Sequence, residues 1–365
     1  MQIAVVGGGV VGLSVAWRLV SAGRRVVLVD PAPTTGASWV AGGMLAPVTE
    51  TWPGEEGLLP IGSASLESWP AFAGELRSAA ADPGLRTDGT VVAALDAADA
   101  AQLETLAEHL ASLGREVERL PGRALRALEP GIGPSIRSGL LVPGDLAVDN
   151  RELLRGLHKA NRQAGVDFVA ASAAAVRGGG VELADGSTVD ADVSVIAAGA
   201  WSGRLHPALG GLVRPVKGEI LRLRGRPGAL PPPGRTVRAL VESRSVYLVP
   251  RSGGELIVGA TQYEAGFDTD VTVAGVRDLL ADAERVLPGT GEYALVECAA
   301  GLRAGSRDNL PLIGWLEPGV LVATGHHRNG FLLAPLTAAA VLALLDGRPH
   351  PAPVTDPARF RKGET

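Results

Sequence analysis

The chain begins with MQIAVVGGGVVGLSVAWRLVSAGRRVVLVD, residues 1–30, in which a glycine triplet interrupts a strongly apolar run. Ile3–Val6 is a short β-branched segment typical of a buried parallel strand. From Leu13 onward apolar residues recur at helical spacing, and a second apolar run, Val26–Val29, is followed directly by Asp30. The pattern predicts a strand, a tight turn, a helix and a second parallel strand.

The glycines of this turn follow the spacing G-x-G-x-x-G. Gly7 permits the tight turn, Gly9 lets the backbone approach a pyrophosphate, and Gly12 lets the helix pack against the strand. Asp30 is placed to accept hydrogen bonds from ribose hydroxyls, and its charge disfavours the 2′-phosphate of NADP. The sequence therefore predicts a dinucleotide site. NAD and FAD both remain open at this point, and a glycine-rich turn without a ligand is the alternative.

Composition excludes several classes of protein. A net charge of -5 argues against general binding to nucleic acid or to an anionic membrane. The sequence contains no uninterrupted stretch of about 18 apolar residues, the length that a membrane-spanning helix needs. The single cysteine excludes an internal disulfide framework and fits a reducing compartment. A strand follows Met1 within two residues, so we expect no signal peptide and a cytoplasmic protein. No cluster has metal-ligand spacing, and no metal is expected.

The length of 365 residues favours two domains, and we expect one of them to be discontinuous. Helical patterns and short strand-like runs alternate from Gly54 to about Asp145. Asp149–Gly165 is a helix pattern with Asp149 as its cap, and DVSVIAAG, 192–199, is a buried strand ending at Gly199. That strand would complete the first binding unit. The loop Thr34–Pro47, rich in small residues, would run close against an extended ligand.

Strand-like runs at 219–223, 239–249 and 254–259 predict an antiparallel sheet in the second domain. The expected fold is α/β, a Rossmann-type nucleotide-binding domain with a second α+β substrate domain built on that sheet. The first domain would comprise 1–53, 146–215 and 299–365, and the second 54–145 and 216–298.

A second strand-loop-helix unit lies near the end of the sequence: a strand at Val320–Ala323, a loop at Gly325–Gly330 and an apolar helix at Phe331–Leu345. A helix N-terminus at the pyrimidine end of a flavin would stabilise the negative charge of the reduced ring at N1 and O2. NAD offers a helix no such target, so this unit favours FAD.

Several motifs identify a family. They include VVGGGVVGLSVAWRL, ASWVAGGMLAP, PVKGE at 215–219, VYLVPR at 246–251, VGAT at 258–261, AGLRAGSRDNLPLIG and GHHRNGFLLAP. With these motifs the chain resembles the flavin amine oxidases of the D-amino-acid oxidase family, and among them the glycine oxidases of thiamine biosynthesis. The first motif is shared by many flavoproteins, whereas the combination of MLAP, PVKGE and GHxRNGxLLAP is much more specific.

The resemblance implies non-covalent FAD and a homo-oligomer, a tetramer. It implies oxidative deamination of glycine, with sarcosine and small D-amino acids as further candidates, by hydride transfer to flavin N5. The products would be glyoxylate, ammonia and hydrogen peroxide, with dioxygen as acceptor, and glyoxyl imine would supply the thiazole of thiamine.

The resemblance also implies contacts for individual residues. The diphosphate and adenosine of FAD would be contacted by Val10, Val11, Asp30 and Pro31. A backbone contact to the adenine would come from Ala174, with Val176 as the alternative. Ala37, Ser38, Gly42, Gly43 and Met44 would line the ribityl chain and isoalloxazine. The flavin edge would be covered by His326, His327, Arg328, Asn329, Gly330, Phe331 and Leu332. Gly199 would leave backbone room near the ligand. His327 stands where the family usually has an aromatic or small residue, which bears on the polarity of the pocket.

For the substrate, the resemblance implies that Arg303 holds the carboxylate, that Tyr247 adds a hydroxyl and that the backbone of Arg328 lies near the amine. Arginine offers a planar two-pronged donor for a carboxylate, and an unpaired guanidinium in the apolar segment around Arg303 would be expensive to bury. A structural ion pair is the alternative for Arg303, and a core tyrosine for Tyr247. A general base among the histidines is disfavoured, because a neutral amine can give up hydride without one.

Three functions remain open from the sequence. The first is a peroxide-forming glycine oxidase. The second is a related flavin amine oxidase or D-amino-acid dehydrogenase with another substrate or acceptor. The third is a non-catalytic FAD-binding protein, which the pair of Arg303 and Tyr247 disfavours, since a pure binding protein needs no carboxylate clamp.

Overall fold

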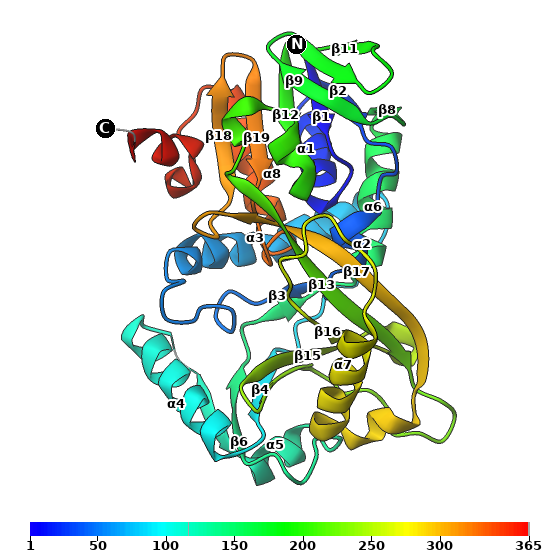
Figure 1. The fold of residues 1–365 in the computed structure, drawn as a ribbon, viewed down its shortest axis with the longest axis vertical. Helices are drawn as coiled ribbons and strands as arrows, with labels where there is room; N and C mark the ends of the chain where they lie inside the picture. Colours follow the sequence, from blue (N-terminus) through cyan, green and yellow to red (C-terminus); the bar gives the residue numbers. More distant parts are fainter. Residues whose placement is uncertain (116, 364–365) are drawn as a thin grey trace.

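The structure, a computed structural model, describes residues 1–115 and 117–363, and its strands form two large sheets (Figure 1). The first sheet has six strands in the order β18-β19-β12-β1-β2-β8, and those from β19 to β8 are parallel. β18 is antiparallel to β19. The strands are β1 (Gln2–Val6), β2 (Arg25–Val29), β8 (Asp167–Val169), β12 (Val193–Ile196), β18 (Leu312–Glu317) and β19 (Val320–Thr324).

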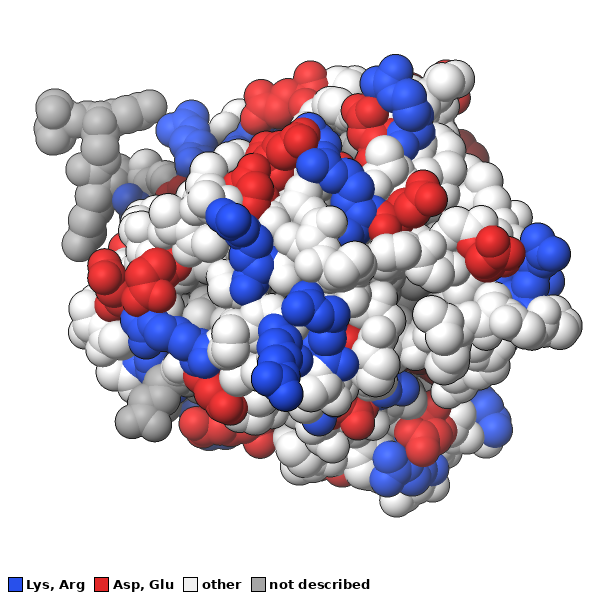
Figure 2. All heavy atoms as spheres, turned by 90° about the horizontal axis from the view of Figure 1, so that it is seen from below, with Lys and Arg blue, Asp and Glu red and all other residues white. Residues whose placement is uncertain are grey.

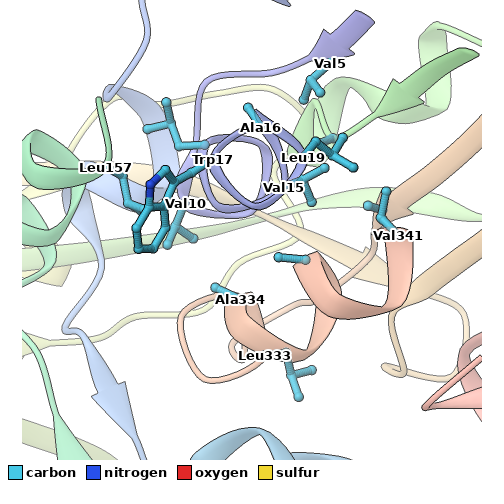
Figure 3. Close-up of a cluster of buried hydrophobic side chains, with 14 of the residues drawn as sticks. Val5, Val10, Val15, Ala16, Trp17, Leu19, Leu157, Leu333, Ala334 and Val341 are labelled. Atoms are coloured by element: carbon cyan, nitrogen blue, oxygen red, sulfur yellow. The ribbon is translucent and has the colours of Figure 1, made fainter. Parts of the chain in front are cut away.

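Helices cover one face of this sheet and enclose its core. α1 (Val10–Ser21) follows the glycine turn and packs against α6 (Asn150–Gln163) and α8 (Ala334–Leu345). Figure 3 looks along α1, with Val341 of α8 on one side and Leu157 of α6 on another, all within one buried cluster. The strand-turn-helix-strand order predicted for residues 1–30 is confirmed, and Asp149 caps α6 as expected.

The second sheet has eight strands in the order β17-β13-β16-β15-β14-β4-β6-β5. All its pairs are antiparallel except β4 and β14, which are parallel. The strands are β4 (Thr90–Ala94), β5 (Glu118–Pro121), β6 (Ser138–Val142), β13 (Val213–Arg224), β14 (Thr236–Val241), β15 (Arg244–Pro250), β16 (Glu255–Gly259) and β17 (Ala294–Ser306).

The remaining elements are short or lie against the two sheets. The other helices are α2 (Gly36–Val40), α3 (Leu58–Ala79), α4 (Ala97–Ser112), α5 (Gly122–Leu128) and α7 (Val273–Val286). Small sheets are formed by β3 (Met44–Leu45) with β7 (Leu146–Ala147), and by β9 (Ala173–Arg177), β10 (Gly180–Leu183) and β11 (Thr188–Asp190). Single 3₁₀ turns are η1 (Gly199–Arg204), η2 (Pro207–Leu209), η3 (Ser252–Gly254), η4 (Pro288–Glu292), η5 (Pro353–Thr355) and η6 (Pro357–Gly363).

Three local expectations were wrong. The run 239–249 is two strands joined by a tight hairpin, because the buried Asp99 carboxylate accepts hydrogen bonds from the amides of Glu242 and Ser243 at the turn. Both turn residues have positive φ. The segment 34–47 is not a loop throughout but contains α2 and β3. The last apolar helix begins at Ala334 rather than Phe331.

Two long strands connect the regions. β13 and β17 pair from Val213 opposite Ser306 to Arg224 opposite Ala294. The predicted domain boundaries at 215/216 and 298/299 fall inside these strands. The division into domains therefore stays a proposal, in which the six-stranded sheet binds the nucleotide and the eight-stranded sheet the substrate.

The surface carries mixed charge. On the face shown in Figure 2, basic and acidic side chains are interspersed. No helix in the described ranges is both long and apolar enough to cross a membrane. Among the described residues, no group of three or more His, Cys, Asp or Glu side chains is arranged to hold a metal ion.

Candidate active site

Two adjoining cavities open at the carboxyl ends of the parallel strands, where ligands bind in open α/β sheets. The first cavity, about 440 Å³, is lined by the glycine turn, Asp30 and the start of η1. The second cavity, about 470 Å³, lies between α2 and the eight-stranded sheet and is lined by Tyr247 and Arg328 among others. Six residues line both cavities: Val10, Ala37, Ser38, Arg303, His327 and Gly330. One extended ligand could therefore occupy both.

The glycine turn has no room for side chains. Gly7 has φ of 117°, and a Cβ added there would lie 2.3 Å from the carbonyl oxygen of Ala197, which directly follows the neighbouring strand β12. A Cβ on Gly12 would lie 1.9 Å from the carbonyl oxygen of Gly7. Helix α1 therefore sits directly against the turn, and its N-terminus faces the first cavity.

The end of α1 suits an anion. Gly9 occupies the N-cap position and brings no side chain to the first-turn amides, and that turn, Val10–Leu13, is apolar. The amide of Val10 donates to Ser38 Oγ at 3.1 Å, and the positive end of the helix dipole favours negative charge at this point. The Asp30 carboxylate accepts hydrogen bonds from the amides of Gly8 at 2.7 Å and Ala32 at 2.8 Å, which fixes it at the rim of the cavity. Together these features fit the pyrophosphate and ribose of a dinucleotide.

Most of the residues predicted to bind cofactor line one of the cavities. The first cavity is lined by Gly7, Gly9, Val10, Val11, Asp30, Pro31, Ala37, Ser38, Gly199, His326, His327 and Gly330. The second cavity is lined by the predicted cofactor residues Gly42, Gly43, Met44, Arg328, Asn329 and Phe331. The predicted substrate residues Tyr247 and Arg303 line it too.

Three predicted residues lie elsewhere. Gly12 lies beneath the turn, as its packing against Gly7 requires. Ala174 is exposed on β9, and its neighbours Ser172 and Ala173 line the first cavity instead. The carbonyl of Leu332 accepts hydrogen bonds from Ser65 and Trp69 of α3, which ties α3 to the loop before α8.

Arg303 is the cation that both cavities share. It lies on β17, and its guanidinium stands over Gly218 of β13, where a Cβ would come within 2.3 Å of Nη1. Nη1 donates long hydrogen bonds to the carbonyls of Lys217 at 3.4 Å and Thr261 at 3.3 Å. Within the described part of the chain, no carboxylate forms an ion pair with Arg303. Burial lowers its pKa below the usual range, yet an arginine keeps its charge in proteins. The site thus holds a part-buried cation without a carboxylate partner among the described residues.

Tyr247 lies on β15 opposite Gly259 of β16, and its ring also fills the space left by Gly42. Burial raises the pKa of the hydroxyl, so the side chain is a neutral hydrogen-bond donor. That hydroxyl makes no hydrogen bond to any described residue. It lines the same cavity as the Arg303 guanidinium.

A second group of charges lines the cavity, and two of its members, Glu50 and Arg238, were not predicted from the sequence. Glu50 forms ion pairs with Arg238 of β14 and with Arg328, whose Nε lies 3.1 Å from Oε2. Arg328 also pairs with Glu55 at 3.0 Å. Burial tends to raise the pKa of Glu50, but Arg238 and Arg328 outweigh that effect and leave it below the usual range. Glu50 follows the MLAP motif by three residues, which is a weak signal, and nothing in the sequence marks Arg238.

The histidines of the last loop are uncharged at neutral pH. Burial lowers the pKa of His326 to about 3, and its Nε2 hydrogen-bonds to Thr337 Oγ1 at 2.9 Å. Burial and the neighbouring Arg328 lower the pKa of His327 to about 4. The amide of His327, at φ of 47°, donates to the carbonyl of Ala304. Neither histidine is well suited to hold a proton at pH 7.

Comparison with known proteins agrees with this geometry. The family model described as FAD dependent oxidoreductase, DAO, matches residues 2–344. The chain is 32% identical to the glycine oxidase of Geobacillus kaustophilus over 356 residues, covering 94% of this chain and 93% of that protein. The crystal structure of glycine oxidase from Geobacillus kaustophilus superposes with a TM-score of 0.89 at 31% identity, covering 98% and 99% of the two chains.

Two further relatives cover most of this chain. The putative thiamine biosynthesis oxidoreductase ThiO of Rhizobium etli is 34% identical over 345 residues, which are 93% of this chain and 95% of that protein. The bifunctional protein ThiO/ThiG of Synechocystis is 32% identical over 353 residues, and the chain spans about half of it, 51%. The match over residues 2–344 and the shared fold settle the classification: the chain belongs to the DAO family of FAD-dependent oxidoreductases, and FAD is its cofactor.

Proposed function

We propose that the protein is an amino-acid oxidase that deaminates glycine to glyoxylate. The observation that carries the proposal is the part-buried guanidinium of Arg303, which faces the junction of the two cavities without a carboxylate partner in the described ranges. An amino-acid carboxylate would supply the missing anion. The names of the relatives from Geobacillus kaustophilus and Rhizobium etli support the substrate and a role in thiamine biosynthesis.

The carboxylate of glycine would bind Arg303 through a charge-assisted pair of hydrogen bonds. The Tyr247 hydroxyl, uncharged and without a described partner, would donate a further one. Arg328 is neutralised by Glu50 and Glu55, so its side chain is not a second carboxylate clamp. Its backbone, in the loop 325–330, would lie near the amine. Among the described residues that line the cavity, Arg303 is thus the one free cation, which favours a substrate with one carboxylate.

The protein residues set the protonation state of the substrate. The guanidinium of Arg303 disfavours a cationic amine in the same cavity, and the low pKa values of His326 and His327 leave no histidine charged there. The amine would therefore react in its neutral form. Bound FAD supplies the acceptor for the hydride that leaves the α-carbon, and dioxygen then takes the two electrons to give hydrogen peroxide.

Loss of hydride from the α-carbon turns glycine with a neutral amine into its iminium. Water then adds to the α-carbon to give glyoxylate and ammonia. The neutral imine would be the form passed on to build the thiazole of thiamine. No step needs a protein base, because the nitrogen lone pair of the neutral amine forms the new double bond as the hydride departs.

A second candidate is a related flavin amine oxidase or D-amino-acid dehydrogenase. The second cavity reaches Arg244, Ser245 and Asp282 beyond Tyr247, which leaves room for a substituent on the α-carbon or the nitrogen. Sarcosine and small D-amino acids are the corresponding substrates, and dioxygen or another acceptor would complete the reaction.

Release of hydrogen peroxide from a panel of glycine, sarcosine and D-alanine tests the proposal. We expect the highest kcat/KM with glycine. Turnover of D-alanine alone, or turnover only with an artificial acceptor in place of dioxygen, would favour the second candidate. A protein that retains FAD but oxidises no member of the panel would contradict both candidates.

We also infer that the enzyme works in the cytoplasm as a homo-oligomer, a tetramer, with non-covalent FAD. The family resemblance supports the assembly, and the single cysteine supports a reducing compartment. Release of free FAD by acid and the mass in analytical ultracentrifugation test the two structural parts. Flavin that stays with the precipitated protein, or a monomer, would contradict them.

A further inference from the structure

The motif PVKGE, 215–219, lies at the centre of a network that the proposed function leaves unexplained. Lys217 is almost completely buried, with a side chain 2% exposed, and its Nζ lies 2.5 Å from Asp268 Oδ2 and 3.6 Å from Glu219 Oε1. Asp268 is 43% exposed. A buried lysine is costly unless it is paired, so this ion pair ties an exposed segment firmly to the interior.

The segment in question is residues 262–271, which we name the strap. It follows β16, rises from the eight-stranded sheet toward the six-stranded sheet, and returns to the start of α7 (Figure 1). Glu219 holds both of its ends, because Thr261 Oγ1 donates to Oε2 at 3.2 Å and the amide of Thr272 donates to Oε1 at 2.8 Å. Two strap residues, Gln262 and Tyr263, line the second cavity.

The middle of the strap packs against η1, on the side of the six-stranded sheet. The guanidinium of Arg204 lies 3.6 Å from the centre of the Phe267 ring, and the ring of Trp201 lies 5.7 Å from it. Both partners belong to η1, and Trp201 lines the first cavity. The strap therefore spans from the substrate side to the nucleotide side of the site.

The same network reaches the carboxylate clamp. The carbonyl of Lys217 accepts hydrogen bonds from the amide of Tyr263 at 3.0 Å and from Arg303 Nη1 at 3.4 Å. The carbonyl of Thr261, the residue directly before the strap, accepts a hydrogen bond from Arg303 Nη1 at 3.3 Å. The position of the strap and the position of the guanidinium are thus set by the same backbone groups.

We propose that Lys217 and Asp268 form a latch that holds the strap over the second cavity and so positions Arg303 for a carboxylate ligand. Both are positioning residues, and the latch rests on the proposed function only in that its ligand is a small carboxylate. Glu219 keeps three hydrogen-bond donors besides Lys217, whereas Asp268 is the exposed arm that can be removed without leaving a buried charge unpaired.

The test uses the FAD-loaded enzyme with Asp268→Asn, and with Asp268→Glu as the variant expected to restore the ion pair. Asp270→Asn is the matched control, since Asp270 is an exposed aspartate two residues further along the strap. Glycolate serves as the binding probe, because it carries the carboxylate of glycine with a hydroxyl in place of the amine. Its Kd is read from the flavin absorbance, beside KM and kcat for glycine, melting temperature, bound FAD and the rate of proteolysis within the strap.

We expect Asp268→Asn to raise the Kd for glycolate and the KM for glycine roughly tenfold, with kcat changed less than about twofold. Proteolysis within the strap should accelerate, while melting temperature and bound FAD stay near wild type. Asp268→Glu should recover most of the loss, and Asp270→Asn should match wild type.

Wild-type Kd and KM in Asp268→Asn would overturn the latch. So would a lower melting temperature with normal ligand binding, which indicates a purely structural ion pair. If the wild-type enzyme oxidises no amine, the proposed function fails, but the glycolate and proteolysis measurements still decide on the latch. If the wild-type enzyme oxidises glycine but Asp268→Asn leaves the Kd for glycolate unchanged, the proposed function stands and only the latch is contradicted.

Discussion

The two cavities of this protein are built in different ways. The first is shaped by backbone: Gly7, Gly9 and the start of α1 come from one short stretch of sequence, and Asp30 follows it after a single helix and strand. The second is shaped by side chains from distant segments, such as Glu50, Arg238 and Arg303, whose charges meet only after folding.

The difference teaches where each kind of function is vulnerable. At Gly7 and Gly12 an added carbon atom collides with backbone, so substitutions there should affect folding and cofactor together. In the second cavity a change at the unpaired Arg303 should affect the substrate alone, whereas a change within the paired group around Glu50 leaves a buried charge without its partner. Four predictions test this contrast.

The largest effect is expected at Arg303. Arg303→Ala should lower kcat/KM for glycine by roughly 2–5 kcal/mol, mainly through KM, because the substrate carboxylate loses its desolvated partner. Arg303→Lys keeps the charge but loses the two-pronged geometry and should fall between. Bound FAD and melting temperature should stay near wild type. Arg307→Ala is the control, because Arg307 lies four residues further along the chain and is exposed, so the KM of this variant for glycine should match wild type. A destabilised Arg303→Ala enzyme with a normal KM would show a structural role instead.

Next is Gly12. Its replacement by Ala would place Cβ 1.9 Å from the Gly7 carbonyl oxygen, so α1 must move away from the turn. We expect a loss of about 3 kcal/mol in the free energy of unfolding, together with loss of FAD. Denaturant unfolding and the flavin content of the purified protein measure both. Gly74 in α3 is the control, because a Cβ there meets open space and Gly74→Ala should not destabilise. Normal FAD retention in Gly12→Ala would contradict the close packing.

At Asp30 the expected effect is smaller. Asp30→Ala removes the carboxylate at the rim and should weaken FAD binding by roughly 1–3 kcal/mol, the scale of hydrogen bonds to a charged group. Substrate affinity of the FAD-saturated enzyme should barely change. Reconstitution of the apoenzyme with FAD measures this, and Asp185→Ala, at an exposed turn in the β10–β11 hairpin, is the control. Unchanged reconstitution would refute the role at the ribose.

The smallest effect concerns pH and Asp145, a fully buried carboxyl that accepts a hydrogen bond from Thr49 beside the Glu50 group. Burial raises its pKa from 3.8 to about 7. The unfolded chain releases this proton at lower pH than the folded protein, so stability falls as pH rises through this interval. Asp145→Asn cannot titrate, and its free energy of unfolding should decline less than that of wild type between pH 6 and 8, by roughly 1–2 kcal/mol. Parallel slopes for the two proteins would contradict the raised pKa.

The course of the chain in the first sheet could be predicted closely. Gly7, Gly12 and Asp30 occupy fixed positions relative to a strand and a helix, because local spacing alone decides the turn. The hairpin at Glu242 and Ser243 could not be predicted, since its turn depends on the carboxylate of Asp99, more than a hundred residues earlier.

The candidate site divides in the same way. Arg303 and Tyr247 were identified through family motifs, and the spacing of the chain gives no reason for their meeting. The adenine contact near Ala174 stays a prediction: Ser172 and Ala173 beside it line the first cavity, and the short three-stranded sheet carries no motif that would fix the contacting residue from sequence.

The sequence by itself determined that a dinucleotide site follows the first strand, because a glycine turn, a helix dipole and an acid at the end of the next strand act over a few residues. Only the tertiary structure decided which charges remain free. Arg238 and Arg328 are neutralised by Glu50 and Glu55, whereas Arg303 stands over Gly218 and stays available. Ion pairing depends on distance in space, and that distance is set by the packing of two sheets whose strands come from distant parts of the chain.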